Sequence, residues 1–192
     1  MNTPAHVVFN LLCVGRQDTT ALIAPAVVGA ILPDAPMFIM YFLAKVVWRQ
    51  PESVIWSQTY YQAGWQNFTD LFNSIPLLLL GLGLCWWAKS PVGIVLFVSM
   101  LLHVAGDFPL HHHDAHRHFF PFSDWRYESP LSYWDPRYHG RIVSRVETVS
   151  MLVGCGILFY TYQSIVGKAT VALVGLSYGA YFLYGLVVWR SL

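Results

Sequence analysis

Six of the eight histidines of the chain lie between Leu101 and Phe122, together with two aspartates, in the segment LLHVAGDFPLHHHDAHRHFFPF. These residues are His103, His111, His112, His113, His116, His118, Asp107 and Asp114. Imidazole and carboxylate groups in one place suit zinc, iron or manganese in a hydrolytic or oxidative site, where an open coordination position can hold water. The three cysteines lie apart from one another in apolar segments, which excludes a cysteine-based zinc finger.

His103 and Asp107 are four residues apart in an apolar run, so a helix places both on one face, about one turn apart. If this run crosses a membrane, a histidine and a carboxylate within it cost free energy, and their presence indicates a function. The alternative is that His103 only donates a hydrogen bond to a neighbouring helix. Not all the clustered histidines can be ligands, so we expect some to orient the ligands and some to face solvent.

Two further ionisable groups, His6 and Asp34, stand where apolar residues would be expected. Asp34 is bracketed by Pro33 and Pro36, which predicts a broken helix whose freed backbone groups line a cavity. An unpaired carboxylate in lipid costs about 2.5–3.5 kcal/mol, so a cation or a hydrogen-bond partner is expected. As an alternative, Asp34 caps the second half of the helix.

The segment that follows the histidines offers other polar candidates. Arg141 and Arg145, again four apart, would form a phosphate clamp beside a metal; the alternative is a charged helix flank or an ion pair with Glu147. The stretch Ser129–Gly140 has two prolines and several aromatic residues, and predicts an ordered cap to which Asp135 or His139 adds an outer ligand.

The elements that position these residues are predicted to be membrane helices. The 192 residues are 56% hydrophobic and 11% charged, against roughly 25% charged in soluble domains. Five nearly uncharged stretches approach the ~17–25 residues that a spanning helix needs. They are Thr19–Ala44, Leu71–Ala88, Ser90–Gly106, Thr148–Gly167 and Ala169–Trp189. We therefore expect one all-α membrane domain, residues 1–192, with about five spanning helices, a short N-terminal helix from the run His6–Val14, and a His-rich loop of about residues 109–140 capping one face.

The charges predict an orientation for this bundle. If Arg49–Asp70 is a loop on the same face as the His-rich loop, Lys and Arg divide eight to three between the faces. The eight are Lys45, Arg49, Arg117, Arg126, Arg137, Arg141, Arg145 and Arg190; the three are Arg16, Lys89 and Lys168. The positive-inside rule places the His-rich loop in the cytoplasm. A net charge of +1 gives no electrostatic footprint for a nucleic-acid partner.

The order of four short motifs resembles the bacterial membrane-bound metal-dependent hydrolases, which are similar in turn to zinc-dependent phospholipase C-like proteins. The motifs are His6, LPD (Leu32–Asp34), FNSIP (Phe72–Pro76) and HVAGD (His103–Asp107). The stretch from His111 to Gly140 is closer still to an uncharacterised branch whose members are sometimes labelled as cobalamin-biosynthesis proteins. The chain has no GxxxxGK[ST] nucleotide-binding loop, so we set that label aside.

This resemblance implies a bacterial inner-membrane protein in which His6, Asp34, His103 and Asp107 are metal ligands. The chain departs from the family pattern at two positions: Pro36 stands where a second Asp is common, and Asn73 stands where a His is common. The histidines after Asp107 are candidates to replace these ligands.

Together these observations predict a membrane-embedded metal-dependent hydrolase for a phosphoester or other ester of a lipid-like substrate. Its metal is a divalent ion, zinc first, with iron and manganese left open. The expected ligands are His6, Asp34, His103, Asp107, His111 and His116. Asp114 is the expected general base and Arg141 or Arg145 the expected phosphate contact.

Two other functions stay open at this stage. A non-catalytic membrane subunit of a larger complex would use the metal as a structural staple with a closed coordination shell. A haem-binding electron carrier would need His6 and His103 to face each other across the cofactor.

Overall fold

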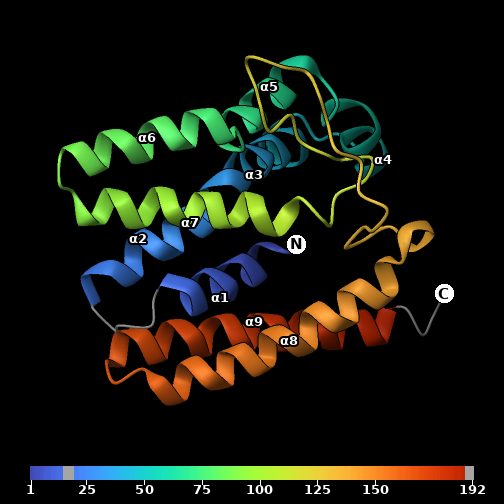
Figure 1. The fold of residues 1–192 in the computed structure, drawn as a ribbon. Helices are drawn as coiled ribbons and strands as arrows, with labels where there is room; N and C mark the ends of the chain where they lie inside the picture. The colour runs from blue at the N-terminus through green and yellow to red at the C-terminus, as the bar shows by residue number, and fades with distance from the viewer. Residues whose placement is uncertain (15–19, 189–192) are drawn as a thin grey trace.

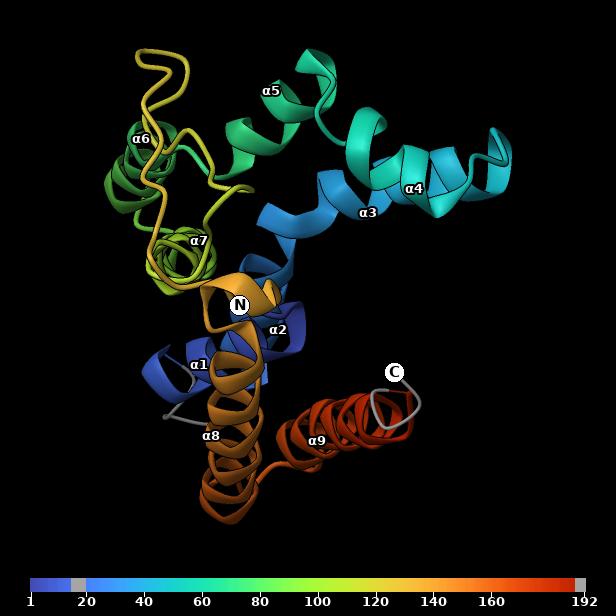
Figure 2. The ribbon, with the colours of Figure 1, turned by 90° about the vertical axis from the view of Figure 1, so that its right-hand side faces the viewer.

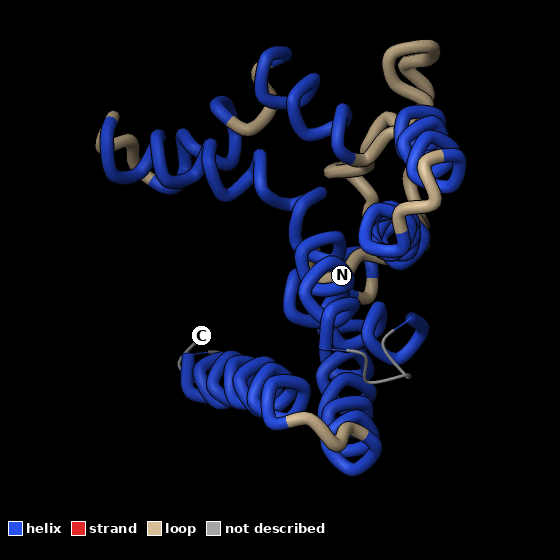
Figure 3. The backbone as a smooth tube through the Cα atoms, turned by 90° about the vertical axis from the view of Figure 1, so that its left-hand side faces the viewer, coloured by secondary structure: helices blue, strands red, loops and turns tan. Residues whose placement is uncertain are grey.

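The computed structural model describes residues 1–14 and 20–188, and this part of the chain is helical without any strand (Figures 1 and 3). Its α-helices are α1 (Thr3–Val14), α2 (Thr20–Ile31), α3 (Ala35–Phe42), α4 (Glu52–Val54), α5 (Ala63–Phe72), α6 (Ile75–Trp87), α7 (Pro91–Asp107), α8 (Gly140–Thr161) and α9 (Ile165–Val188). Short π-helical segments, Leu43–Val47 and Ile55–Thr59, flank α4. Arg16 and Arg190, two of the Lys and Arg residues counted to predict the membrane orientation, lie outside the described residues.

The expected break at Pro33 is confirmed. Between α2 and α3 the chain forms a 3-10 turn over Leu32–Asp34, because Pro33 and Pro36 have no N–H to donate to a continuous helix. Asp34 occupies the position before α3, but its side chain makes no capping bond there. The capping alternative is therefore wrong, and the carboxylate of Asp34 is available for other partners.

Polar and apolar contacts hold α1 among α2, α7 and α8 (Figure 1). Asn10 of α1 donates through Nδ2 to the Ser99 carbonyl oxygen at 2.7 Å and to Ser99 Oγ at 2.8 Å. Ser99 Oγ donates in turn to the Ala26 carbonyl oxygen of α2 at 2.5 Å. Because all three residues are buried, this relay fixes the distances between the three helices. Beside it, Val8 and Leu11 pack against α8 and α9 in the largest apolar core.

Among the residues that the structure describes, three helical segments are long and apolar enough to cross a membrane: Ala21–Val47, Ala63–Trp87 and Gly140–Thr161. The helices Thr3–Val14 and Pro91–Asp107, and the part Ile165–Ala180 of α9, are apolar but shorter. Over residues 1–14 and 20–188, the protein is thus all-helical, with three candidate membrane-spanning helices.

The prediction of a loop over Arg49–Asp70 is wrong for most of this segment. This segment contains α4, the π-helical segment after it and α5. In α5 the aromatic residues Trp65, Phe68 and Phe72 recur at helical spacing and contact one another, with ring centroids 6.3 and 5.6 Å apart. This apolar face makes α5 an amphipathic helix that packs on α3.

The expected loop after Pro109 is confirmed as an irregular segment, apart from a 3-10 turn at Pro136–Tyr138. It is anchored to the junction between α5 and α6 (Figure 2). Ile75 N donates to the His118 carbonyl oxygen at 2.8 Å, and Arg117 Nε donates to Asp70 Oδ2 at 2.5 Å. Ser74 Oγ donates to the carbonyl oxygen of Phe120.

The contact between α2 and α7 depends on Gly29. A Cβ atom at this position would lie 2.4 Å from the Leu96 carbonyl oxygen and 2.7 Å from Ser99 Cβ, whereas a Cβ at Gly83 meets nothing within 4 Å. We expect Gly29→Ala to lower the free energy of unfolding by about 1–3 kcal/mol, the usual cost of overpacking. Unfolding in detergent measures this, with Gly83→Ala as the control; equal stability of the two variants would contradict the close packing.

Candidate metal centre

The carboxylate of Asp107 lies at the centre of a buried cluster of histidines. Its Oδ1 atom is 2.9 Å from His6 Nε2 and 3.1 Å from His111 Nε2, and its Oδ2 atom is 3.0 Å from His103 Nε2. Asp107 ends α7, His103 lies one turn earlier, His6 comes from α1, and His111 begins the irregular segment. Three separate parts of the chain therefore meet at one carboxylate, which is 1% exposed.

On one side of Asp107, His6, Asp34 and His103 form a group that we name the inner triad; its ligand atoms lie within 4.8 Å of one another. The rings of His6 and His103 stack with centroids 3.6 Å apart and an interplanar angle of 14°. Asp34 Oδ1 lies 3.6 Å from His103 Nε2, and Asp34 Oδ2 accepts a hydrogen bond from Thr3 Oγ1 at 2.5 Å. Stacked rings leave no room for a porphyrin between them, so the haem hypothesis is wrong.

On the other side, Asp107 joins His111 and His116 in a second group, the outer triad, with ligand atoms again within 4.8 Å of one another. All three residues are buried. Asp114 supports this triad from behind. Its Oδ2 atom is 3.0 Å from His111 Nδ1 and accepts a hydrogen bond from Trp134 Nε1 at 2.9 Å.

The donor atoms of both triads suit a metal ion. His103 Nδ1 donates to the Ala30 carbonyl oxygen at 2.8 Å, which directs its Nε2 toward Asp34 and Asp107. That Nε2 atom, His6 Nδ1 and both ring nitrogens of His111 are buried without a well-aligned hydrogen bond, although the His103 and His111 nitrogens lie 3.0–3.1 Å from carboxylate oxygens of Asp107 and Asp114. Buried imidazole nitrogens without hydrogen bonds, close to carboxylate oxygens, are the arrangement that a divalent metal ion satisfies. These buried groups can therefore hold a metal ion.

The residues after α7 show how strongly the charges interact. Burial alone would lower the pKa of His111, but Asp107 and Asp114 raise the pKa to about 9. Burial alone would raise the pKa of Asp114, but His111 and Trp134 hold this pKa well below its usual range. Burial lowers the pKa of His118 to about 4, so this histidine is neutral at pH 7.

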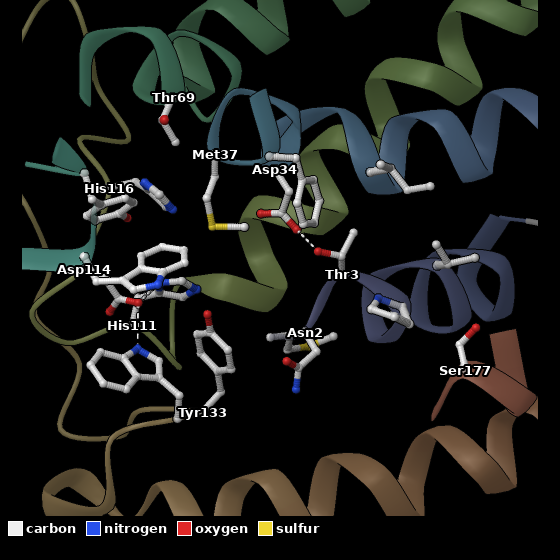
Figure 4. Close-up of a pocket in the computed structure, with 18 of the residues that line it drawn as sticks. Asn2, Thr3, Asp34, Met37, Thr69, His111, Asp114, His116, Tyr133 and Ser177 are labelled. Carbon is white, nitrogen blue, oxygen red and sulfur yellow. Dashed lines mark hydrogen bonds and ion pairs between the residues drawn. The ribbon is translucent and has the colours of Figure 1, made fainter. Parts of the chain in front are cut away.

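A cavity of about 970 Å³ opens beside the outer triad. Figure 4 shows His111, Asp114 and His116 on one side, Asp34 and Met37 in the middle, and Ser177 of α9 on the far side. The lining near Ser177 includes Leu173 and Val174, and its surface is mainly apolar. Its volume lies at the upper end of the ~300–1,000 Å³ of ordinary ligand pockets. The cavity therefore connects a polar, metal-type site with an apolar region.

The structure brings together the six residues predicted as metal ligands, but not every other candidate. Arg141 and Arg145 are exposed on α8 and do not line the cavity, and His139 is also exposed. Asp135 accepts hydrogen bonds from Arg137 instead of joining the triads. Asn73 is buried and donates to the carbonyl oxygens of Pro33 and Thr69.

Several polar residues of the site were not predicted from the sequence. Asp70 is fully buried, 3.6 Å from His116 Nδ1, and it pairs with Arg117. Thr3 holds Asp34, and Trp134 holds Asp114. A lone charged residue within the aromatic segment before FNSIP was the available signal for Asp70.

No family model matches the chain, and no curated protein or solved structure matches it either. The resemblance to membrane-bound metal-dependent hydrolases therefore stays a prediction. The chemistry of the site rests on the geometry of the two triads and the cavity.

Asp107 belongs to the outer triad and also contacts His6 and His103 of the inner triad. Substitutions can therefore separate the loss of metal from one triad and from both. We expect Asp107→Ala to remove metal from both triads, Asp34→Ala from the inner triad alone, and His116→Ala from the outer triad alone. Elemental analysis of the detergent-purified variants measures the ions per chain, with His139→Asn as the control. Full metal content in Asp107→Ala would contradict this arrangement.

Proposed function

We propose that the protein is a membrane-embedded metal-dependent hydrolase for a phosphoester or other ester of a lipid-like substrate. The observation that supports this proposal most directly is the cavity, which reaches His111, Asp114 and His116 at one side and apolar residues of α9 at the other. A divalent metal, zinc first and iron or manganese as alternatives, would bind to the inner and outer triads. Such an ion activates water and polarises the bond that is cut.

The polar residues of the cavity have distinct proposed roles. Asp114 holds His111 in position through Oδ2, while its Oδ1 atom is buried without a hydrogen-bond partner. We assign Asp114 Oδ1 as the acceptor of the proton that the attacking water loses. Thr3 and the Ala30 carbonyl oxygen orient Asp34 and His103 for metal binding.

The apolar part of the cavity supports a lipid-like substrate. Leu173 and Phe38 line it, and both also present more than a third of their surface to the exterior. An alkyl chain bound along this surface would leave its polar end near the outer triad. The exposed α8 arginines, Arg141 and Arg145, are far less suitable for contacting such a substrate, because neither lines the cavity.

The cavity also favours an enzyme over a non-catalytic subunit of a larger membrane complex. A structural metal site is closed by its ligands, whereas His111, His116 and Asp34 all border open volume. The subunit function would require a partner to fill this cavity.

For the membrane arrangement, we propose that α7 and α9 cross the bilayer together with the three longer helical segments, which gives five spans with α1 as a short internal helix. The irregular segment after α7 would then cap one face. The bacterial inner membrane, with this face in the cytoplasm, agrees with the resemblance and with the excess of Lys and Arg.

Hydrolysis assays test the proposal directly. We expect the purified protein to cleave long-chain p-nitrophenyl phosphodiesters or carboxyl esters in mixed micelles, to lose this activity with a chelator and to regain it with zinc. Asp114→Asn should lower kcat by about 10²–10⁴-fold, the usual contribution of a general base. The control is Asp124→Asn, because the Asp124 side chain is 90% exposed. Cleavage that resists chelation, or no cleavage of any such ester, would reject the hydrolase.

The apolar part of the cavity predicts a dependence on chain length. Leu173→Trp places a larger side chain in the cavity, so we expect it to raise KM for long-chain esters about tenfold, or by about 1.4 kcal/mol, and to leave short-chain esters unaffected. Leu176→Trp is the matched control, since Leu176 is on the same helix and 73% exposed but does not line the cavity. An equal KM for both variants would show that the chain binds elsewhere.

A further inference from the structure

A third group of metal-type ligands lies outside the two triads. We propose that His112, His113 and Glu128 form a peripheral site for a divalent cation of the zinc type. Their ligand atoms lie within 4.8 Å of one another, and none of the three residues lines the cavity. His112 is half-buried, and His113 and Glu128 are exposed, so this site is open to solvent, unlike the buried triads.

The ring of His112 is already oriented for metal binding. Its Nδ1 donates to the Ser129 carbonyl oxygen at 2.6 Å, which leaves the lone pair of Nε2 free to bind an ion. The ring also stacks on Tyr138, with centroids 3.6 Å apart and an angle of 25°. The His113 ring lies 4.3 Å from the His112 ring, at 72°. A histidine that binds a metal through one ring nitrogen usually donates a hydrogen bond from the other ring nitrogen, often to a backbone carbonyl oxygen.

The peripheral site joins two arms of the irregular segment. The outgoing arm carries His111–His113, and the returning arm carries Glu128–Tyr133. Backbone hydrogen bonds already connect them, from Ser129 N to the His111 carbonyl oxygen at 2.9 Å and from Tyr133 N to the Leu110 carbonyl oxygen at 3.0 Å. A cation bound by His112 and His113 of one arm and Glu128 of the other would add a further link between the two arms, on their solvent-exposed side. Since His111 and Tyr133 line the cavity, the cation would stiffen the cavity wall.

The chemistry of the ligands selects the ion. Two imidazoles and one carboxylate suit Zn²⁺ or Cu²⁺ rather than Mg²⁺ or Ca²⁺, which prefer oxygen ligands alone. Three protein ligands leave a coordination position for water. The site therefore binds zinc without needing any residue of the two triads.

Zinc titration of the detergent-purified full chain tests the peripheral site. Competition with a chromophoric zinc chelator gives the number of sites and their affinities for wild type, His113→Ala, Glu128→Gln and the double variant. We expect each single variant to weaken one site about tenfold or more, and the double variant to bind one zinc ion fewer. His139→Asn is the control, because His139 is an exposed histidine of the same segment in a left-handed conformation that Asn tolerates.

A second readout separates this site from general zinc binding. Zinc should slow tryptic cleavage after the exposed Arg137 in wild type and in His139→Asn, but not in the double variant. Equal zinc binding by wild type and the double variant, or an equal loss in His139→Asn, would overturn the proposal. Hydrolase activity does not enter either readout, so failure of the proposed function leaves this test intact.

Discussion

The carboxylate of Asp107 is the group on which the rest of the site depends. It is almost fully buried and lies within about 3 Å of imidazole nitrogens from His6, His103 and His111. A buried carboxylate without charged or hydrogen-bonded partners would be strongly destabilising. The start of α1, the end of α7 and the beginning of the irregular segment must therefore converge on this point. Farther along α1 and α7, the Asn10–Ser99–Ala26 relay holds these two helices together and joins them to α2.

The break in the second apolar stretch has a comparable role. The 3-10 turn over Leu32–Asp34 holds the Asp34 carboxylate 3.6 Å from His103 Nε2. The same turn frees the Pro33 carbonyl oxygen, and Asn73 satisfies it from the junction of α5 and α6. In this way the Asn73 side chain, which also donates to the Thr69 carbonyl oxygen of α5, compensates part of the loss of helical hydrogen bonds at the break.

The sequence predicted those features that depend on local spacing. The four-residue interval between His103 and Asp107, the prolines around Asp34 and the irregular segment after Pro109 are all visible in a short window. Contacts between distant segments, such as Asp70 with Arg117 and Asn10 with Ser99, have no local signal. The Arg141–Arg145 interval shows the limit of spacing arguments. It places both residues on one side of α8, but the buried side is that of Ser144, Glu147 and Thr148, so the arginines face outward.

The run of three adjacent histidines shows how one short segment can serve two surfaces. In an irregular chain, neighbouring side chains point in different directions, so His111 is buried at the cavity while His113 is exposed. The backbone of this segment is held by hydrogen bonds from Ser129 and Tyr133, and the His112 ring stacks on Tyr138 of the 3-10 turn Pro136–Tyr138. A change at His112 would therefore shift the backbone that positions His111. The inward and outward histidines are mechanically coupled even though they belong to separate ligand groups.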